Sequence, residues 1–329
     1  MIKATLFTSA PYLNNGQFDK VSMNDCLYGF YLLKKRFEEN GINLNTQDIN
    51  SPRESKFIIY NEMPKSKNII PGKNNYLIMF ESKIIQADNW NVKKHKYFKK
   101  IFTWDDNLVD GKKYIKINYA HKIPTDLDYD LSKKGKLCAM VASHKFTKHS
   151  LELYTERVKA IRWFEQNHPE DFDLYGIGWD KYYFKGYLSR LNRFEILRKL
   201  LMTKKYSLFK GPAPSREVLP KYKFAICYEN ARDIPGYITE KIFNCFFAGC
   251  VPVYWGAPNV TDYIPSDTFI DKREFRTYDD LYDYLKNMSD KEYIDYLEAI
   301  KNFIESDKIY PFSAECFVEI LTRAILEDI

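Results

Sequence analysis

The chain has 329 residues, of which 45% are apolar and 29% are charged, a composition typical of soluble globular proteins. This length suits about two domains at roughly 100–200 residues each. The net charge of +6 fits an anionic ligand or a membrane surface, but it falls short of the basic stripe of a nucleic-acid binder, so we expect no nucleic-acid partner. The densest basic run, Lys93–Lys100, predicts a solvated surface, with anionic lipid or an acidic glycan as the alternative.

The cysteines and the lack of long apolar segments bear on the compartment. No two of the six cysteines form a C-x-x-C pair, and Cys138 and Cys227 lie in apolar runs. This argues against a zinc site or a disulfide framework and fits a reducing compartment. The start, Met1–Phe7, has no signal-like apolar region, and no segment reaches about 18 apolar residues. The sequence predicts a cytoplasmic protein without a membrane span, with peripheral association at the inner face of the membrane as a further location.

Short apolar runs alternate with amphipathic segments along the chain. Helices are expected from about Asp25 to Asn40, before Gly41, and from Ser150, as the N-cap, to Asn167. Several of the expected strands are continuously apolar, as in strands buried on both faces of a parallel sheet. The alternation predicts an α/β fold. The expected strands are Ile2–Phe7, Phe57–Tyr60, Tyr76–Phe80, Ile101–Trp104, Leu137–Ala142, Phe172–Tyr175, Phe224–Tyr228 and Val251–Trp255.

A polar, charged segment interrupts this alternation. Residues Pro124–Gly135 read Pro-Thr-Asp-Leu-Asp-Tyr-Asp-Leu-Ser-Lys-Lys-Gly, which indicates a linker between two α/β domains. We expect an N-terminal domain at 1–130 and a C-terminal domain at 131–308. The last segment, 309–329, is rich in Phe, Ile and Leu and is expected to form a closing helix that docks on one of the domains.

The segment Tyr222–Asn259, here called the central segment, carries the strongest functional signal. A buried strand ends at Tyr228 and is followed by the polar pair Glu229 and Asn230. After a loop, a helix is expected to begin at Thr239, its N-cap, and to stop at Gly249. In open α/β sheets, ligands bind beyond the carboxyl ends of the strands. This strand–loop–helix unit is therefore where we expect a ligand site.

Lys241 lies in the first turn of that helix, where the helix dipole disfavours a cation. A bound diphosphate would reverse this penalty, because both the backbone N–H groups and the ammonium would face the anion. The neighbouring Glu240 would then accept hydrogen bonds from ribose hydroxyls. The alternative is an ordinary helix start, with Glu240 favourable to the dipole and Lys241 in solvent.

The central segment contains four informative blocks, which are Tyr222–Phe224, Tyr228–Asn230, Tyr237–Lys241 and Ala248–Gly256. Together they resemble the α-1,3/1,4-fucosyltransferase family (glycosyltransferase family 10), in a bacterial-type soluble form. Their order and spacing are highly specific to that family. A weaker resemblance covers most of the chain: Met79–Ser82 is similar to the family's acceptor-side acidic motif, and Glu152–Arg157 to the start of its donor domain.

The resemblance implies two Rossmann-like domains facing across a cleft, the arrangement called GT-B. The N-terminal domain would bind the acceptor and the C-terminal domain GDP-fucose. The implied reaction moves L-fucose from GDP-β-L-fucose, with inversion, to a hydroxyl of an N-acetylglucosamine-containing oligosaccharide, giving an α-1,3 or α-1,4 linkage. It implies no metal and no cofactor, and it fits the synthesis of surface glycans similar to Lewis antigens.

The family's functional residues can be carried over to matching positions of this sequence. Glu81 would be the catalytic base. Lys241 and Arg157 would hold the diphosphate, and Glu240 would bind the ribose. The donor-binding residues implied by the resemblance are Arg157, Asn230, Tyr237, Glu240 and Lys241.

The chemistry of a single displacement needs these residue types. Negative charge grows on the departing diphosphate, and two fixed cations with a helix N-terminus stabilise it without a divalent metal. A base takes the proton of the acceptor hydroxyl and typically contributes about 10²–10⁴-fold. Glu81 ends an apolar strand, where partial burial would raise its pKa; a solvated strand end is the alternative. Arg157 is preferred over Arg162, because Glu165 offers Arg162 a surface partner.

Two other functions fit parts of the sequence. A metal-dependent glycosyltransferase of the GT-A type would hold its metal with an Asp-x-Asp pair, either Asp171-Phe172-Asp173 or Asp126-Leu127-Asp128. A non-catalytic nucleotide- or glycan-binding homologue would bind GDP without transferring sugar. The presence of Glu81, Glu240 and Lys241 argues against the second alternative.

Overall fold

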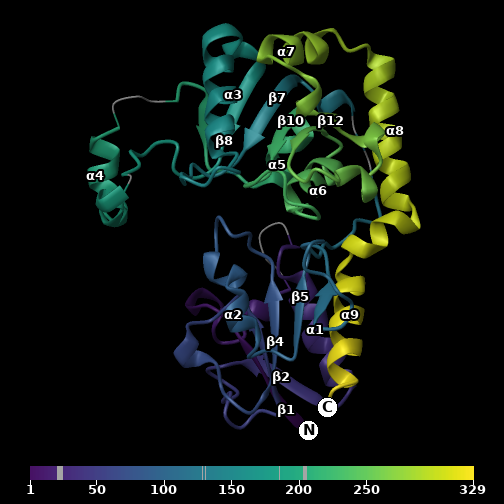
Figure 1. The fold of residues 1–329 in the computed structure, drawn as a ribbon. Helices are drawn as coiled ribbons and strands as arrows, with labels where there is room; N and C mark the ends of the chain where they lie inside the picture. Colours follow the sequence, from purple (N-terminus) through teal and green to yellow (C-terminus); the bar gives the residue numbers. More distant parts are fainter. Residues whose placement is uncertain (21–24, 128, 130, 185, 203–205) are drawn as a thin grey trace. The chain divides into compact units, whose positions relative to one another are not determined.

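In the computed structural model the chain forms two compact units, each built on a six-stranded parallel sheet (Figure 1). The structure describes residues 1–20, 25–127, 129, 131–184, 186–202 and 206–329. The first unit contains Met1–Pro124, Ile234–Glu240 and Ile304–Ile329, and the second contains Thr125–Asp233 and Lys241–Phe303. A short piece of the central segment therefore belongs to the first unit although both of its neighbours in the chain belong to the second.

The first sheet has the strand order β2-β1-β3-β4-β5-β6. Helices α1 (Tyr28–Glu39) and α9 (Ala314–Leu326) pack on each other and share one apolar core with the sheet, in which Phe30, Leu33 and Phe317 are buried. A second cluster lies around Tyr60 and Leu77. The strands are β1 Ile2–Phe7, β2 Ile42–Thr46, β3 Phe57–Asn61, β4 Asn74–Met79, β5 Lys100–Thr103 and β6 Tyr114–Lys116.

The second sheet has the order β12-β11-β10-β7-β8-β9. Its strands are β7 Lys136–Val141, β8 Phe172–Tyr175, β9 Phe209–Gly211, β10 Tyr222–Tyr228, β11 Val251–Trp255 and β12 Ile270–Asp271. The helices between and after them are α3 Tyr154–Asn167, α4 Glu195–Leu200, α5 Ser215–Val218, α6 Glu240–Phe247, α7 Tyr278–Asn287 and α8 Asp290–Glu305. The short helix α2, Val92–His95, lies in the first unit.

The structure confirms all eight expected strands, within two residues at each end, and adds β2, β6, β9 and β12. The four additional strands are short or, like Ile42–Thr46, rich in Asn and Thr, so they lack a continuous apolar run. The prediction that Ser150 caps α3 is wrong, because the helix begins at Tyr154. The side chain of Glu152 instead accepts a hydrogen bond from the Thr155 N–H at 2.9 Å. The closing helix docks on the first unit as α9.

Two further features concern the whole described chain. None of its described helices combines the length and the apolar character that a membrane crossing requires. All six cysteines are free thiols, and four of them, Cys138, Cys227, Cys245 and Cys250, are buried. They pack as small apolar side chains.

Candidate functional site

The unit β10–α6–β11 has the geometry expected of a ligand-binding edge. Strands β10 and β11 are parallel neighbours, with Tyr228 level with Trp255, so α6 connects the end of one to the start of the other. The helix therefore begins on the carboxyl edge of the second sheet, where ligands bind in open α/β sheets. It stops as predicted at Gly249, which has a φ of +59°.

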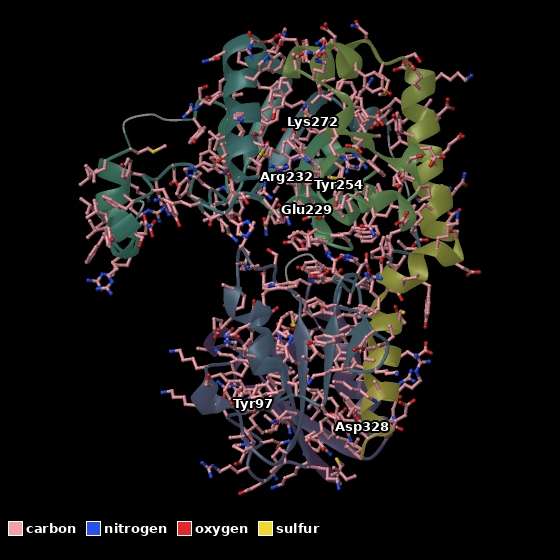
Figure 2. All side chains as sticks on the ribbon, in the orientation of Figure 1. Tyr97, Glu229, Arg232, Tyr254, Lys272 and Asp328 are labelled. Carbon is pink, nitrogen blue, oxygen red and sulfur yellow. The ribbon has the colours of Figure 1, made fainter. Side chains whose placement is uncertain are left out.

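Lys241 is not solvated but ion-paired. Its Nζ lies 3.2 Å from Oε2 of Glu229, the residue that follows β10, and the Glu229 side chain is fully buried. The Glu229 N–H donates to the Trp255 carbonyl at 2.8 Å, which continues the ladder beyond the strand end. Figure 2 labels Glu229 at this position. The protein thus supplies a carboxylate that offsets the dipole penalty on Lys241.

Gly256, the residue after β11, allows the side chains of Tyr254 and Glu229 to pack closely. A Cβ atom at Gly256 would lie 2.3 Å from the Tyr254 hydroxyl oxygen and 2.5 Å from Cγ of Glu229. Both distances are too short for any larger residue without displacement of a buried neighbour. The Tyr254 hydroxyl also accepts the Ala257 N–H at 3.2 Å. The glycine that follows Trp255 therefore leaves the space that the buried Glu229 side chain occupies.

Arg157 reaches the same strand end from α3. It is buried, with 4% of its surface exposed, and its Nη2 donates to the Tyr228 carbonyl at 2.6 Å and to Oδ1 of Asn230 at 3.1 Å. Its guanidinium lies over the ring of Tyr154, 5.1 Å from the centroid. The inward-facing position predicted for Arg157 is confirmed. Its rival Arg162 pairs with Glu165, as the sequence also predicted.

Two predicted donor residues lie in the segment that packs with the first unit. Tyr237 is fully buried, and its ring lies 4.6 Å from that of Trp104, between centroids. Glu240 is half-buried, and its charge acts on the half-buried side chains of Tyr119 and His121. The structure therefore groups Arg157, Asn230 and Lys241 in the second unit. It places Tyr237 and Glu240, like Glu81, among residues of the first.

Glu81 comes two residues after β4, at the carboxyl edge of the first sheet. Its backbone is held on both sides: its N–H donates to Oε1 of Glu62 at 3.0 Å, and its carbonyl accepts from Nδ2 of Asn89 at 3.2 Å and from Nε1 of Trp90 at 3.4 Å. The side chain is half-buried. Glu81 therefore lies at a fixed strand end and is only partly exposed, whereas the alternative interpretation expected a solvated side chain.

Glu62 was not predicted from the sequence. It follows β3, has a φ of +72°, and its carboxylate accepts the backbone N–H groups of both Phe80 and Glu81. Asn89 donates to its second oxygen. Burial raises the pKa of Glu62 to about 7, and the charge of Glu81 adds to this shift. The available signal was that Glu62 and Glu81 each follow one of two apolar strands, which pair here as β3 and β4.

The Asp-x-Asp alternative finds no support in the geometry around β8. Asp171 accepts from Nζ of Lys286 and from the Tyr282 hydroxyl, each at 2.7 Å, while Asp173 pairs with Lys136 and with other partners. Both lie at the amino end of β8, the opposite edge from the start of α6. Lysines therefore already neutralise both carboxylates. In the second candidate pair, Asp128 lies outside the described residues.

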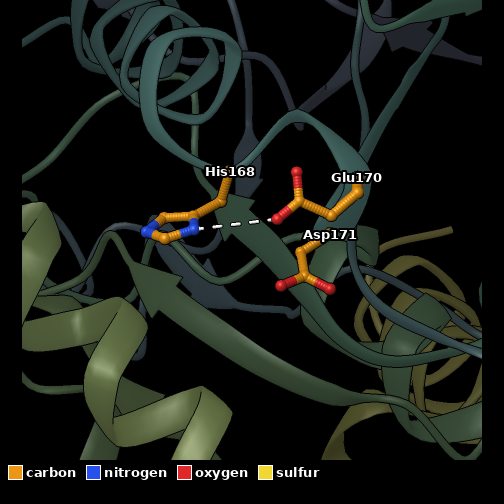
Figure 3. A group of neighbouring side chains, drawn as sticks. All are labelled: His168, Glu170 and Asp171. Atoms are coloured by element: carbon orange, nitrogen blue, oxygen red, sulfur yellow. Dashed lines mark ion pairs between the residues drawn. The ribbon is translucent and has the colours of Figure 1, made fainter.

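A related cluster lies just before β8. His168, Glu170 and Asp171 bring one ligand atom each to within 4.8 Å of one another (Figure 3). The imidazole of His168 stacks on the Tyr282 ring, with 3.6 Å between centroids. Asp171 is also bound to Lys286, so the cluster is an ion-paired group at the surface.

The two parallel-sheet units have the fold of GT-B glycosyltransferases. Solved structures of an α1,3-fucosyltransferase, alone and with GDP-fucose, match with TM-scores of 0.58 and 0.55, each at 14% identity and over 100% of this chain and 91% of that chain. At this identity the likeness establishes the fold. It confirms the predicted fold class of two Rossmann-like α/β domains.

The model of glycosyltransferase family 10 (fucosyltransferase), C-terminal part, matches residues 131–309, and the chain belongs to this family. The α-(1,3)-fucosyltransferase FucT of Helicobacter pylori is 34% identical over 117 residues, which are 34% of this chain and 24% of that protein. The 4-galactosyl-N-acetylglucosaminide 3-α-L-fucosyltransferase 9 of Mus musculus is 40% identical over 85 residues, 25% of this chain and 23% of that protein. The matches thus span about a quarter of the length of these relatives.

Proposed function

We propose that the chain is an inverting fucosyltransferase. It moves L-fucose from GDP-β-L-fucose to a hydroxyl of an N-acetylglucosamine-containing oligosaccharide and forms an α-1,3 or α-1,4 linkage. The observation that carries the proposal is the pair of held cations, Arg157 and Lys241, beside the end of β10 in a family 10 chain. Relatives named for α-1,3-fucosyl transfer and a 3-α-L-fucosyltransferase acting on galactosyl-N-acetylglucosaminide support the donor and the acceptor class.

The two cations would bind the donor diphosphate. Arg157 is fixed by the Tyr228 carbonyl and Asn230, and Lys241 by Glu229, so neither must be ordered when the ligand arrives. Preorganised cations are the groups that stabilise charge on a leaving phosphate most effectively. Asn230 would contact the donor beside Arg157. No divalent metal is needed in this scheme.

Tyr237 and Glu240 would act from the segment that enters α6. The burial of Tyr237 against Trp104 favours a supporting role, in which it fixes the direction of this segment. Glu240, the first residue of α6, would accept hydrogen bonds from the ribose hydroxyls.

Glu81 would be the catalytic base. The acceptor hydroxyl gives its proton to the Glu81 carboxylate while its oxygen forms the new bond to C1 of fucose. The bond from C1 to the phosphate oxygen breaks, and GDP leaves with the electron pair. This displacement on the face opposite to the leaving group inverts the anomeric centre.

Transfer from GDP-fucose to a glycan-acceptor array, with the linkage of each product determined, tests the proposal. We expect an α-linked fucose on acceptors that contain N-acetylglucosamine, unchanged when EDTA is present. Complete loss of turnover in EDTA would favour the metal-dependent alternative. GDP binding without transfer to any acceptor would favour the non-catalytic homologue.

A further inference from the structure

A folded arm leaves the second sheet after β8. It spans residues 177–202, of which 185 lies outside the described part, and contains α4; we call it the α4 arm. Figure 1 shows α4 standing away from β8 and α3 of the same unit. The arm starts from the carboxyl end of β8, the edge of the sheet on which α6 begins.

The α4 arm is folded on itself and has an interior. The Tyr182 N–H donates to the Arg198 carbonyl at 2.8 Å. The side-chain amide of Asn192 pairs with both the N–H and the carbonyl of Phe184, each at 2.9 Å, and Phe184 is buried. These contacts join the start of the arm to α4 and fix which side chains point outward.

The outward side chains are strongly apolar. Eight of the eighteen exposed large apolar side chains in the described chain lie in this arm. Ile196 and Leu200, one helical turn apart on α4, are 77% and 78% exposed, and Tyr187 is fully exposed. Such a concentration marks a contact surface. The other exposed members are Ile177, Tyr182, Leu188, Phe194 and Leu201.

The charge of the α4 arm is mainly positive. Its described residues include five Lys or Arg and two acids, Asp180 and Glu195. Glu195 pairs with Lys181 at 2.8 Å and with Lys199 at 3.5 Å, and among the described residues neither acid of the arm forms an ion pair with one of its arginines. Arg190 and Arg193 are exposed beside Leu188 and Phe194.

The basic run 93–100, which the sequence singled out, is different. Lys94 pairs with Asp88 at 2.6 Å, and Lys99 and Lys100 pair with Asp328 at 3.2 and 3.4 Å. Three of its cations are thus neutralised within the first unit. The strongest described combination of exposed cations and apolar side chains is the α4 arm.

We propose that the α4 arm is a docking surface for anionic lipid bilayers. Exposed Leu, Ile, Phe and Tyr next to Arg and Lys are the composition of segments that lie in the interface, with the rings and aliphatic chains among the acyl chains and the cations at the phosphates. The excess of five cations over two acids among the described residues of the arm fits a surface that is mainly positive. Docking would hold the carboxyl edge of the second sheet beside the membrane, and it is independent of the reaction proposed above.

Co-sedimentation with vesicles tests this. The full chain is mixed with vesicles of phosphatidylethanolamine and phosphatidylglycerol, or of phosphatidylcholine alone. Two variants remove separate parts of the surface: Arg190→Gln with Arg193→Gln, and Ile196→Ser with Leu200→Ser. The matched control is Lys93→Gln with Lys96→Gln, two exposed cations of the other basic run. Unchanged melting temperatures show that the variants are folded.

We expect binding to the phosphatidylglycerol vesicles that falls with added salt and is at least about tenfold weaker in both arm variants, with the control unchanged. Absence of binding to these vesicles would overturn the proposal. So would equal binding to phosphatidylcholine, or binding that is lost only in the Lys93 and Lys96 control. Self-association without lipid that the Ile196 and Leu200 changes abolish would assign the surface to a second copy of the chain instead.

Discussion

The carboxylate of Glu62 holds the backbone of Glu81, accepting its N–H at 3.0 Å and that of the preceding residue, Phe80, at 3.1 Å. Glu62 adopts a positive φ, which is uncommon for a residue with a side chain, at the end of β3. Two acidic residues therefore meet at one strand edge, and one of them fixes the main chain that carries the other. This relationship predicts how stability depends on pH.

The folded chain should lose stability as the pH rises through the range between the two pKa values of Glu62. Its pKa is about 7 when folded and about 4.5 when unfolded, so in this window the folded state keeps a proton that the unfolded state has released. The contribution of Glu62 to the free energy of unfolding therefore falls between about pH 4.5 and pH 7 and stays constant above about pH 7. Over this pH range, the free energy of unfolding of Glu62→Gln should fall by on the order of 2 kcal/mol less than that of the parent chain.

Urea unfolding at a series of pH values measures this difference. The control is Glu54→Gln, which alters an exposed carboxyl paired with Lys3 and should keep the pH profile of the parent chain. An identical pH dependence for the parent and for Glu62→Gln would show that Glu62 does not titrate near pH 7.

Glu81→Gln tests the catalytic base. The substitution keeps the shape of the side chain and the backbone contacts to Glu62 and Asn89, but it cannot accept a proton. We expect normal GDP binding by calorimetry and a fall in fucosyl transfer of at least about two orders of magnitude. Near-normal turnover would remove Glu81 from the mechanism.

Lys241 has a structural partner as well as a proposed ligand, and the two roles can be separated. Lys241→Met leaves the Glu229 carboxylate buried without its ion pair and should destabilise the fold by about 3–5 kcal/mol. Adding Glu229→Gln removes that buried charge and should recover most of the stability. If Lys241 binds the diphosphate, the double variant remains weak in GDP binding and turnover. Recovery of GDP affinity together with stability would limit Lys241 to a structural role.

Gly256→Ala should disturb the same ion pair from the other side. The new methyl group would overlap the Tyr254 hydroxyl and Cγ of Glu229, so we expect a loss of about 1–3 kcal/mol and weaker GDP binding. Gly135→Ala is the matched control, because a Cβ there has no neighbour within 4 Å. Thermal unfolding and GDP titration of the two variants provide the comparison, and equal behaviour would contradict the packing argument.

Much of the fold follows from local sequence patterns. The continuous apolar runs of β3, β4, β10 and β11 are buried on both faces, and such runs have few alternatives to a central parallel strand. The start and stop of α6 and the inward position of Arg157 depend on neighbours within a few residues, so periodicity and capping signals predict them.

Only the tertiary structure determines which side chains contact one another in the candidate site. Glu229 meets Lys241, and Glu62 meets Glu81, only because parallel strands align their carboxyl ends at one edge, and strand order is a long-range property. The lysines of the 93–100 run are neutralised by acids at Asp88 and at Asp328, near the far end of the chain. The sequence alone determined the family, the strand–loop–helix segment and the candidate residues. Which charges are paired, and which apolar side chains of the α4 arm stay exposed, depends on contacts that no local pattern records.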